Sequence, residues 1–249
     1  MTASPRPLVW ITRAEPGASA TAERVRTLGA LPLVAPLLEV RALETPLPDL
    51  SEFAALAFTS ANGVRALAGR TPARGLPVFA VGAATARTAR EAGFRQVLSA
   101  DGDVAALAQG MAARARDLRG PILHPTTTEP AGDLAADLAA HGLVIQAVPL
   151  YETVPAQVPK ALLARALEAQ AVLLHSPKAA RRLAVLLRGR GAPDMAALCL
   201  SRAVGRPLAR ARLGPRLYAP MPMESALLNL IARLPAEAGP VAAASPVAP

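Results

Sequence analysis

The sequence repeats itself at an interval of about 114 residues, and this duplication limits the possible folds more than any other feature. Residues 11–16 read ITRAEP and residues 125–130 read PTTTEP, so the two Glu-Pro pairs are 129 − 15 = 114 residues apart. Pro36-Leu37-Leu38-Glu39 returns as Pro149-Leu150-Tyr151-Glu152, at 149 − 36 = 113. A pattern that recurs at one interval along a chain indicates two copies of a structural unit.

Further matches extend the repeat, with an offset that grows slowly toward the C-terminus. Phe58-Thr59-Ser60 corresponds to Leu174-His175-Ser176, at 176 − 60 = 116. Ala80-Val81-Gly82 corresponds to Cys199-Leu200-Ser201, at 201 − 82 = 119. Short insertions in loops produce a drift of this kind, so the duplication spans nearly the whole chain.

Each copy reads as strands that alternate with helices. The first strand spans residues 8–12 in one copy and 122–125 in the other, and the helix that follows ends at Gly29 or Gly142, as in a left-handed C-cap. Alternating strands and helices predict parallel sheets with right-handed crossovers. With 52% hydrophobic but only 3% aromatic residues, the cores must consist of Leu, Val and Ala. We therefore predict an α/β fold with two pseudo-duplicated parallel-sheet domains.

Two domain arrangements fit the duplication, and the residues alone leave both open. Either each copy forms one domain, or the copies exchange halves at the repeated Pro-Leu-x-Glu segments. The second arrangement gives one domain of residues 1–36 and 154–234, a second of 41–148, linker strands at 37–40 and 149–153, and a tail of 235–249. The tail is rich in Pro and Ala and is expected to be disordered.

The net charge of 27 − 18 = +9 favours an anionic partner. Only two of the 27 basic residues are lysine, so a bias toward Arg and Ala in the gene is an alternative reason for the charge. The densest basic set, Arg206, Arg210, Arg212 and Arg216, has no interleaved aromatic residues, which argues against nucleic acid as partner. The chain has neither a Walker lysine motif nor a GxGxxG motif, which disfavours nucleotide binding.

Cysteine, histidine and hydropathy patterns narrow the class of protein further. The single cysteine, Cys199, excludes an internal disulfide and lies in an apolar run that reads as a buried strand. The three histidines are far apart in sequence, so no metal-ligand spacing is present and no metal or cofactor is predicted. No signal peptide and no run of membrane-spanning length is recognised, so a cytoplasmic protein without membrane contact is expected.

Small polar residues stand where the strands of each copy end. In open α/β sheets, ligands bind beyond the carboxyl ends of the strands, near helix N-termini. The candidate residues for binding a substrate there are Thr59, Ser60, Gly82, Thr85, Ser176 and Ser201. Helix capping alone would account for a Ser or Thr at such a position. The same free N–H groups and helix dipoles attract carboxylates, so several ends together would form an anion site.

Two larger side chains carry more specific hypotheses. Tyr151 stands at the repeat position of Leu38 and is either a packed ring or a phenol that acts as hydrogen-bond donor or general acid. Arg13 follows the first strand and is either solvated or paired with a ligand carboxylate. Paired carboxylates are absent from the strand ends, and the repeated Glu39 and Glu152 are interpreted as structural.

Taken in order, these segments resemble the uroporphyrinogen-III synthase (HemD-like) family over about residues 8–234. The segments that carry the resemblance are Ile11-Thr12-Arg13, Phe58-Thr59-Ser60-Ala61-Asn62-Gly63-Val64, Val81-Gly82 with Thr85, Leu150-Tyr151-Glu152-Thr153 and His175-Ser176-Pro177. The resemblance implies the exchanged halves, with a two-stranded linker and a cleft between the domains. It also implies the reaction: linear hydroxymethylbilane loses water and closes to uroporphyrinogen III with its last pyrrole ring inverted, through a spiro intermediate and without cofactor or metal.

The family also implies roles for single residues. Tyr151 would assist the loss of the substrate hydroxyl, and Thr59, Ser60, Thr85, Ser176 and Ser201 would line the cleft. The expected ligand is a polycarboxylate linear tetrapyrrole, handed over by hydroxymethylbilane synthase to a monomeric enzyme. Thr126-Thr127 stands where the family often has Arg-Gly, and Val204 stands where many members carry a hydroxyl. A catalytically inactive two-domain binding module for an anionic small molecule is the alternative.

Overall fold

The computed structural model describes residues 6–130 and 132–234, which divide into two compact units. Unit 1 contains residues 6–39 and 155–234, and unit 2 contains residues 40–154. The chain therefore crosses from unit 1 into unit 2 and back again. The predicted tail at 235–249 lies outside the residues that the structure describes.

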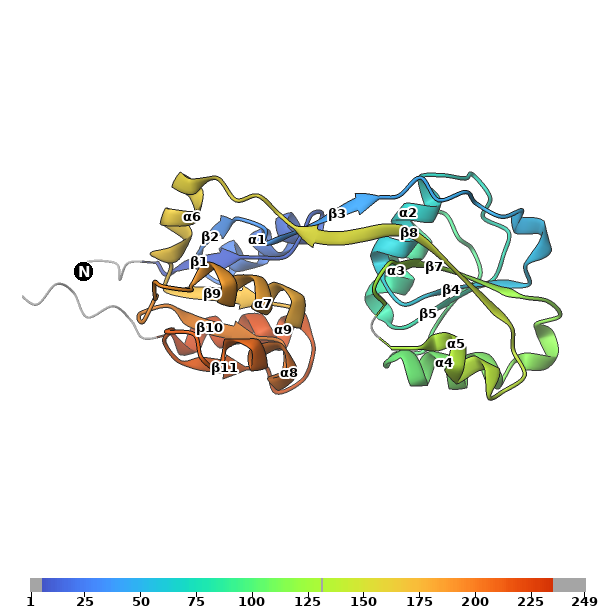
Figure 1. Cartoon of the computed structure of the whole chain (residues 1–249). Coiled ribbons are helices and arrows are strands. Elements are labelled where there is room, and N and C mark those ends of the chain that lie inside the picture. Colours follow the sequence, from blue (N-terminus) through green and yellow to red (C-terminus); the bar gives the residue numbers. More distant parts are fainter. Residues whose placement is uncertain (1–5, 131, 235–249) are drawn as a thin grey trace, which may run out of the picture. The chain divides into compact units, whose positions relative to one another are not determined.

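Both crossings fall within strands. Strand β3 (Leu38–Ala42) carries the chain into unit 2 and β8 (Ile145–Pro155) carries it back, and the two are neighbours in one sheet (Figure 1). β8 is one continuous strand of eleven residues, so residues 149–153 form its middle rather than a separate linker strand. The cleft that was expected between the two domains stays a prediction.

Unit 1 is built on a five-stranded parallel sheet in the order β11-β10-β9-β1-β2. Its strands are β1 (Leu8–Ile11), β2 (Leu31–Val34), β9 (Ala171–Leu174), β10 (Ala196–Cys199) and β11 (Arg216–Tyr218). Its helices are α1 (Gly17–Thr27), α6 (Lys160–Leu167), α7 (Pro177–Leu186), α8 (Arg202–Gly205) and α9 (Glu224–Leu228), with 3-10 turns η3 (Arg206–Leu208) and η4 (Asn229–Arg233). The N-terminal strand β1 pairs with β9, so two distant parts of the sequence form one sheet.

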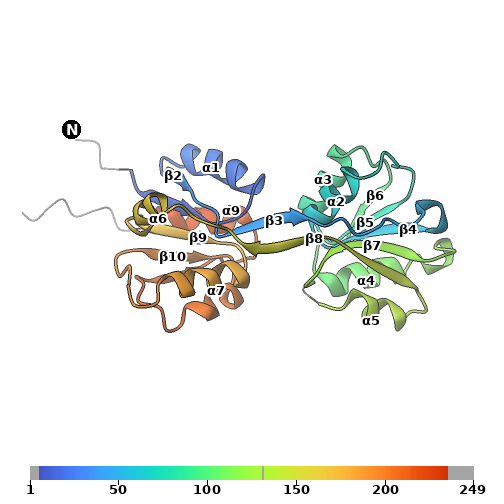
Figure 2. The same ribbon diagram turned by 45° about the horizontal axis from the view of Figure 1, so that its top comes forward.

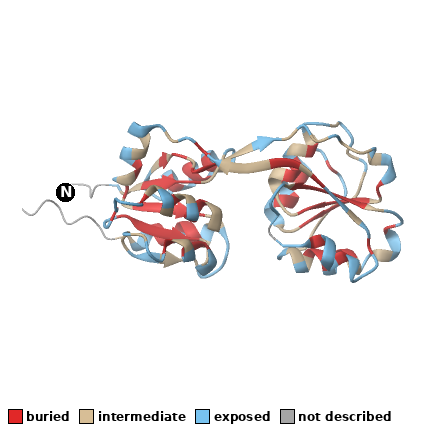
Figure 3. Ribbon diagram, in the orientation of Figure 1, coloured by how far each residue is buried: buried red, intermediate tan, exposed pale blue. Residues whose placement is uncertain are grey.

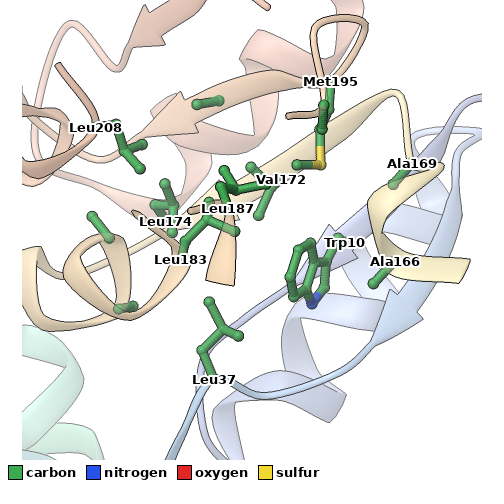
Figure 4. Packing of buried hydrophobic residues seen from close by; sticks show 14 of the residues in the cluster. Trp10, Leu37, Ala166, Ala169, Val172, Leu174, Leu183, Leu187, Met195 and Leu208 are labelled. Atoms are coloured by element: carbon green, nitrogen blue, oxygen red, sulfur yellow. The ribbon is translucent and has the colours of Figure 1, made fainter. Parts of the chain in front are cut away.

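The central strands of unit 1, β1, β9 and β10, are buried on both faces because successive side chains alternate between two cores. Trp10 and Val172 point into the core that α7 covers, where they pack with Leu183 and Leu187 (Figure 4). Val9 and Ile11 face the second core, under α1 and α9. Trp10 is fully buried, and its indole N–H donates a hydrogen bond to the Ala35 carbonyl at 2.7 Å, which satisfies its one polar atom.

Unit 2 has a six-stranded sheet in the order β3-β8-β7-β4-β5-β6, in which the pairs from β8 to β6 are parallel. Its other strands are β4 (Ala55–Phe58), β5 (Val78–Ala80), β6 (Val97–Ser99) and β7 (Ile122–Thr127). Its helices are α2 (Ala61–Ala68), α3 (Ala83–Glu91), α4 (Val104–Ala112) and α5 (Leu134–Ala139), with 3-10 turns η1 (Leu50–Glu52) and η2 (Ala115–Asp117). Helices α2 and α3 cover one face of the sheet, and α4 and α5 cover the other (Figure 2).

The predicted α/β class with parallel sheets is confirmed. All four residues of β4, β9 and β10 are buried, as expected for parallel strands with helices on both faces (Figure 3). Gly29 and Gly142 have φ values of 79° and 71°, so they occupy the left-handed position just after α1 and α5 that the sequence predicted. Within the described ranges, no helix is long and apolar enough to cross a membrane.

Candidate functional site

In unit 2, predicted site residues gather at the carboxyl ends of β4 and β7, beside β8. Thr59 and Ser60 directly follow β4, and Tyr151 lies in β8, opposite Thr127 of β7. Gly63 in the first turn of α2 explains how these elements come so close. A Cβ at Gly63 would stand 2.5 Å from the backbone oxygen of Pro125, so only glycine lets the helix N-terminus approach β7.

Tyr151 is a buried phenol at this edge, with 5% of its surface exposed. Burial raises the pKa of the phenol above its usual value, and a hydrogen bond with the Ser60 side chain lowers it in part. The Ser60 hydroxyl also caps α2, because it accepts a hydrogen bond from the backbone N–H of Asn62 at 3.1 Å. Tyr151 therefore stays protonated at neutral pH and can donate its O–H.

Two buried polar side chains of β7 face the same strand end. Nε2 of His124 lies 3.1 Å from the Thr59 hydroxyl, and burial lowers the pKa of His124 to about 4, so its ring is neutral at pH 7. Thr126 is 4% exposed, and its hydroxyl oxygen has no hydrogen-bond partner among the described residues. An unpaired buried hydroxyl costs about 1–3 kcal/mol, which a bound ligand could recover.

Gly82 and Thr85 begin the next helix of unit 2. Gly82 is the N-cap of α3 and has no side chain to bond, so the first N–H groups of α3 have no side-chain cap. Thr85 lies in the first turn and is 6% exposed. Together they offer N–H groups and one hydroxyl at the carboxyl end of β5, which suits an anion.

In unit 1, Ser176 and Ser201 follow β9 and β10 and act as helix caps. The Ser176 hydroxyl accepts from the N–H of Ala179 at 3.2 Å, and the Ser201 hydroxyl accepts from the N–H of Val204 at 3.4 Å. The capping interpretation of these serines is therefore observed in the structure. Each hydroxyl keeps one hydrogen that it can donate to a ligand.

Arg13 does not stand alone at the end of β1, because Glu224 neutralises it. The two side chains form a salt bridge of 3.1 Å, and a second arginine, Arg24, lies 2.7 Å from the other Glu224 oxygen. Thr21 also donates its hydroxyl hydrogen to Glu224. Burial raises the pKa of Glu224, but contacts with His175 and Thr21 and the charge of Arg13 outweigh it and hold the pKa at about 2. A substrate carboxylate would have to compete with Glu224 for Arg13.

His175 is one of the residues at the strand ends that the sequence prediction missed. It follows β9 at the repeat position of Thr59, and both of its ring nitrogens are buried without a hydrogen-bond partner in the described part of the chain. Its Nε2 lies 3.8 Å from Glu224, which is longer than a hydrogen bond. Burial lowers the pKa of His175, and the opposing influence of Glu224 does not restore it. A neutral imidazole with two unused polar atoms is available to a ligand.

Cys199 takes no part in this chemistry. It is fully buried in β10, as the sequence predicted, and burial raises the pKa of its thiol to about 11, so it carries no thiolate at neutral pH. Among the described residues, no three Cys, His, Asp or Glu side chains come together as metal ligands. The polar groups at the strand ends are hydroxyls, backbone amides, a phenol and neutral imidazoles, which suit hydrogen bonding and proton donation.

Comparison with known proteins gives one family. The family model described as "Uroporphyrinogen-III synthase HemD" matches residues 19–229, which is 229 − 19 + 1 = 211 of 249 residues. No curated protein sequence matches the chain.

Solved structures give the same fold. Uroporphyrinogen-III synthetase from Helicobacter pylori 26695 has a TM-score of 0.67 and 19% identity, and the match covers 93% of this chain and 100% of that one. A mutant uroporphyrinogen III synthase from the extremely thermophilic bacterium Thermus thermophilus has a TM-score of 0.52 and 18% identity, covering 92% and 98%. At these identities the structural likeness concerns the fold.

Proposed function

Since a family model matches most of its length, this chain belongs to the uroporphyrinogen-III synthase family, and we propose that it catalyses the reaction of that name. Linear hydroxymethylbilane would lose water and close to uroporphyrinogen III, with its last pyrrole ring inverted, as a step of tetrapyrrole biosynthesis. The observation that carries the proposal is the place of the Tyr151 phenol, which is buried in β8 opposite Thr127 and bonded to the Ser60 side chain.

Tyr151 fits the role of general acid in this reaction. The hydroxyl of the substrate must leave as water, and the phenol can donate its hydrogen to that oxygen while the C–O bond breaks. Ser60 can then donate a hydrogen bond to the phenolate. Ring closure releases one proton from the substrate, which restores the phenol, so the net change is the loss of one water.

The strand ends of both units fit the binding of substrate carboxylates. In unit 2 we assign this role to Thr59, Gly82 and Thr85, through their hydroxyl and amide hydrogens. In unit 1 we assign it to Ser176 and Ser201, with Arg13 contributing charge that Glu224 partly neutralises. The enzyme would act by holding a flexible, reactive substrate in one conformation, which requires positioning more than strong acid–base groups.

We also propose that the chain acts as a cytoplasmic monomer that receives hydroxymethylbilane from the preceding synthase. Membership of the family supports these points. Size-exclusion chromatography with light scattering tests the monomer, and a stable dimer would contradict it. A competition experiment with the preceding synthase tests the hand-over. If hydroxymethylbilane passes directly between the two enzymes, an added trap for the free compound should capture little of it.

The product isomer decides whether the chain has the proposed activity. Hydroxymethylbilane is generated enzymatically in the presence of the purified protein, and the uroporphyrin isomers are separated after oxidation. The proposal predicts the type III isomer. Accumulation of only the spontaneous type I isomer would refute the assignment as a synthase.

Replacing Tyr151 by phenylalanine tests the role of the phenol. Tyr151→Phe keeps the ring that packs in β8 but removes the acid, and we expect the rate of type III formation to fall about a hundredfold with folding intact. The chain offers a matched control in Tyr218, its only other tyrosine, and Tyr218→Phe should retain the rate. An unchanged rate in Tyr151→Phe would leave Tyr151 with a packing role only.

A further inference from the structure

Unit 1 contains a pocket of about 460 Å³ that the proposed reaction does not use. Arg188, Arg190, Arg210 and Arg212 line it, together with Gly189 and Pro207. The first two arginines lie between α7 and β10, and the other two lie between η3 and β11. Because both segments lead into the amino ends of strands, the pocket lies at the opposite edge of the sheet from Ser176 and Ser201.

The two segments that carry these arginines are fastened to each other. The N–H of Ala192 donates to the carbonyl of Arg212 at 2.8 Å, and Ala192 pairs with Leu213 in a parallel bridge. A Cβ at Gly191 would stand 2.9 Å from the Cβ of Arg212, so glycine permits this close approach. Backbone contacts thus bring the two segments together, and four exposed arginines from these segments line one pocket.

Acidic residues do not balance the positive charge of the arginines around this pocket. None of the four guanidinium groups that line the pocket forms a hydrogen bond or salt bridge to another residue in the part of the chain that the structure describes. From 188 to 216 the sequence has seven arginines and one acidic residue, Asp194, so 7 − 1 = +6 of the total +9 lies in this segment. Four guanidinium groups around one pocket repel one another unless an anion joins them.

The C-terminal end of α7 gives one structural reason for arginines at this place. A helix C-terminus carries a partial charge of about −0.5, which a nearby cation stabilises. One arginine after the helix would satisfy that partial charge, whereas four full charges line the pocket. The excess of positive charge requires another explanation.

We propose that this pocket binds a small polyanion with two or more phosphate or carboxylate groups. The planar guanidinium group forms paired hydrogen bonds with either kind of anion, and several arginines around one space favour a ligand with several anionic groups. The volume lies in the range of about 300–1,000 Å³ that is usual for small-molecule pockets. The site is independent of the proposed synthase activity, since none of its residues is among those assigned to that reaction.

Titration calorimetry of the full chain tests the proposal, with pyrophosphate as the phosphate probe and citrate as the carboxylate probe. We expect saturable binding of at least one of them at physiological salt, which identifies the kind of anion. Arg210→Gln combined with Arg212→Gln should weaken binding at least about tenfold, or about 1.4 kcal/mol. The matched control combines Arg165→Gln with Arg233→Gln, two exposed arginines of unit 1 outside the pocket, and should bind as the unchanged chain does.

Several outcomes would overturn the proposal. One is that neither probe binds, including the case in which duplex DNA binds instead. Another is that the control variant loses as much affinity for the probe as the variant of the pocket. Circular dichroism confirms that each variant is folded. Since Tyr151 lies in unit 2, Tyr151→Phe should leave the affinity for the probe unchanged, so failure of this site and failure of the synthase activity are separate results.

Discussion

Replacing Glu224 by glutamine will destabilise unit 1, by an amount that follows from the charges around this carboxylate. Glutamine keeps the shape of the side chain but leaves Arg13 and Arg24 without a counter-charge. The pKa of Glu224 falls from an ordinary 4.5 to about 2, and about 1.36 kcal/mol per pKa unit gives an upper bound of roughly 3 kcal/mol. Because the side chain is 23% exposed, solvent screening lowers the expected loss to about 2 kcal/mol.

The pH dependence of this loss has a definite sign. The folded state holds the Glu224 carboxylate at a lowered pKa, so its stabilisation is fully present above pH 4.5 and disappears as pH falls toward 2. The difference in unfolding free energy between the unchanged chain and Glu224→Gln should therefore be constant from pH 7 to 5 and roughly halved near pH 3.

The fluorescence of Trp10 allows the unfolding of unit 1 to be followed separately in urea denaturation. Trp10 is the only tryptophan of the chain and is fully buried in the unit 1 core, so its fluorescence follows the unfolding of that unit. The control is Glu23→Gln, which breaks an exposed pair with Arg26 on α1 and should change the unfolding free energy by less than about 0.5 kcal/mol. A loss in Glu224→Gln that is as large at pH 3 as at pH 7 would refute the electrostatic explanation.

Three further substitutions test the buried polar groups at the strand ends. Thr126→Val should raise the unfolding free energy by about 1 kcal/mol, since it removes an unpaired buried hydroxyl. Thr12→Val, at the matching repeat position, should lower the unfolding free energy by about 1–2 kcal/mol, because the Thr12 hydroxyl donates to a backbone carbonyl at 2.6 Å. Equal effects of Thr126→Val and Thr12→Val in urea denaturation would contradict both predictions. His175→Phe should lower kcat/KM about tenfold, since it removes two nitrogens that are available to a ligand, and an unaltered kcat/KM would exclude contact with substrate.

The architecture could be predicted from the sequence because the duplication and the strand patterns are local signals. The apolar run around Cys199 has the length and composition of a buried parallel strand, and it forms β10. Gly29 and Gly142 could be predicted as helix ends because glycine has no Cβ and readily adopts the positive φ found at both positions. Ser176 followed by Pro177 likewise predicts a helix start, and the structure shows the cap hydrogen bond.

The composition of the candidate site was less predictable, because it depends on contacts between distant segments. Glu224 is the first residue of the short helix α9 and has no repeat counterpart, so nothing in the sequence connects it with Arg13, 211 residues away. The arginine pocket was missed for a similar reason. Arg210 and Arg212 were recognised as part of a dense basic set, but Arg188 and Arg190 join them only through the contact between Ala192 and Leu213.

The double crossing between the units sets the order in which the chain can fold on the ribosome. Strand β1 lies between β2 and β9 in the sheet of unit 1, and β9 begins only at Ala171. All of unit 2 emerges before β9 does, so it can complete its sheet while β1 still lacks its neighbour β9. Vectorial synthesis therefore leaves the edge of β1 that pairs with β9 without its hydrogen-bonded neighbour until Ala171–Leu174 has been made.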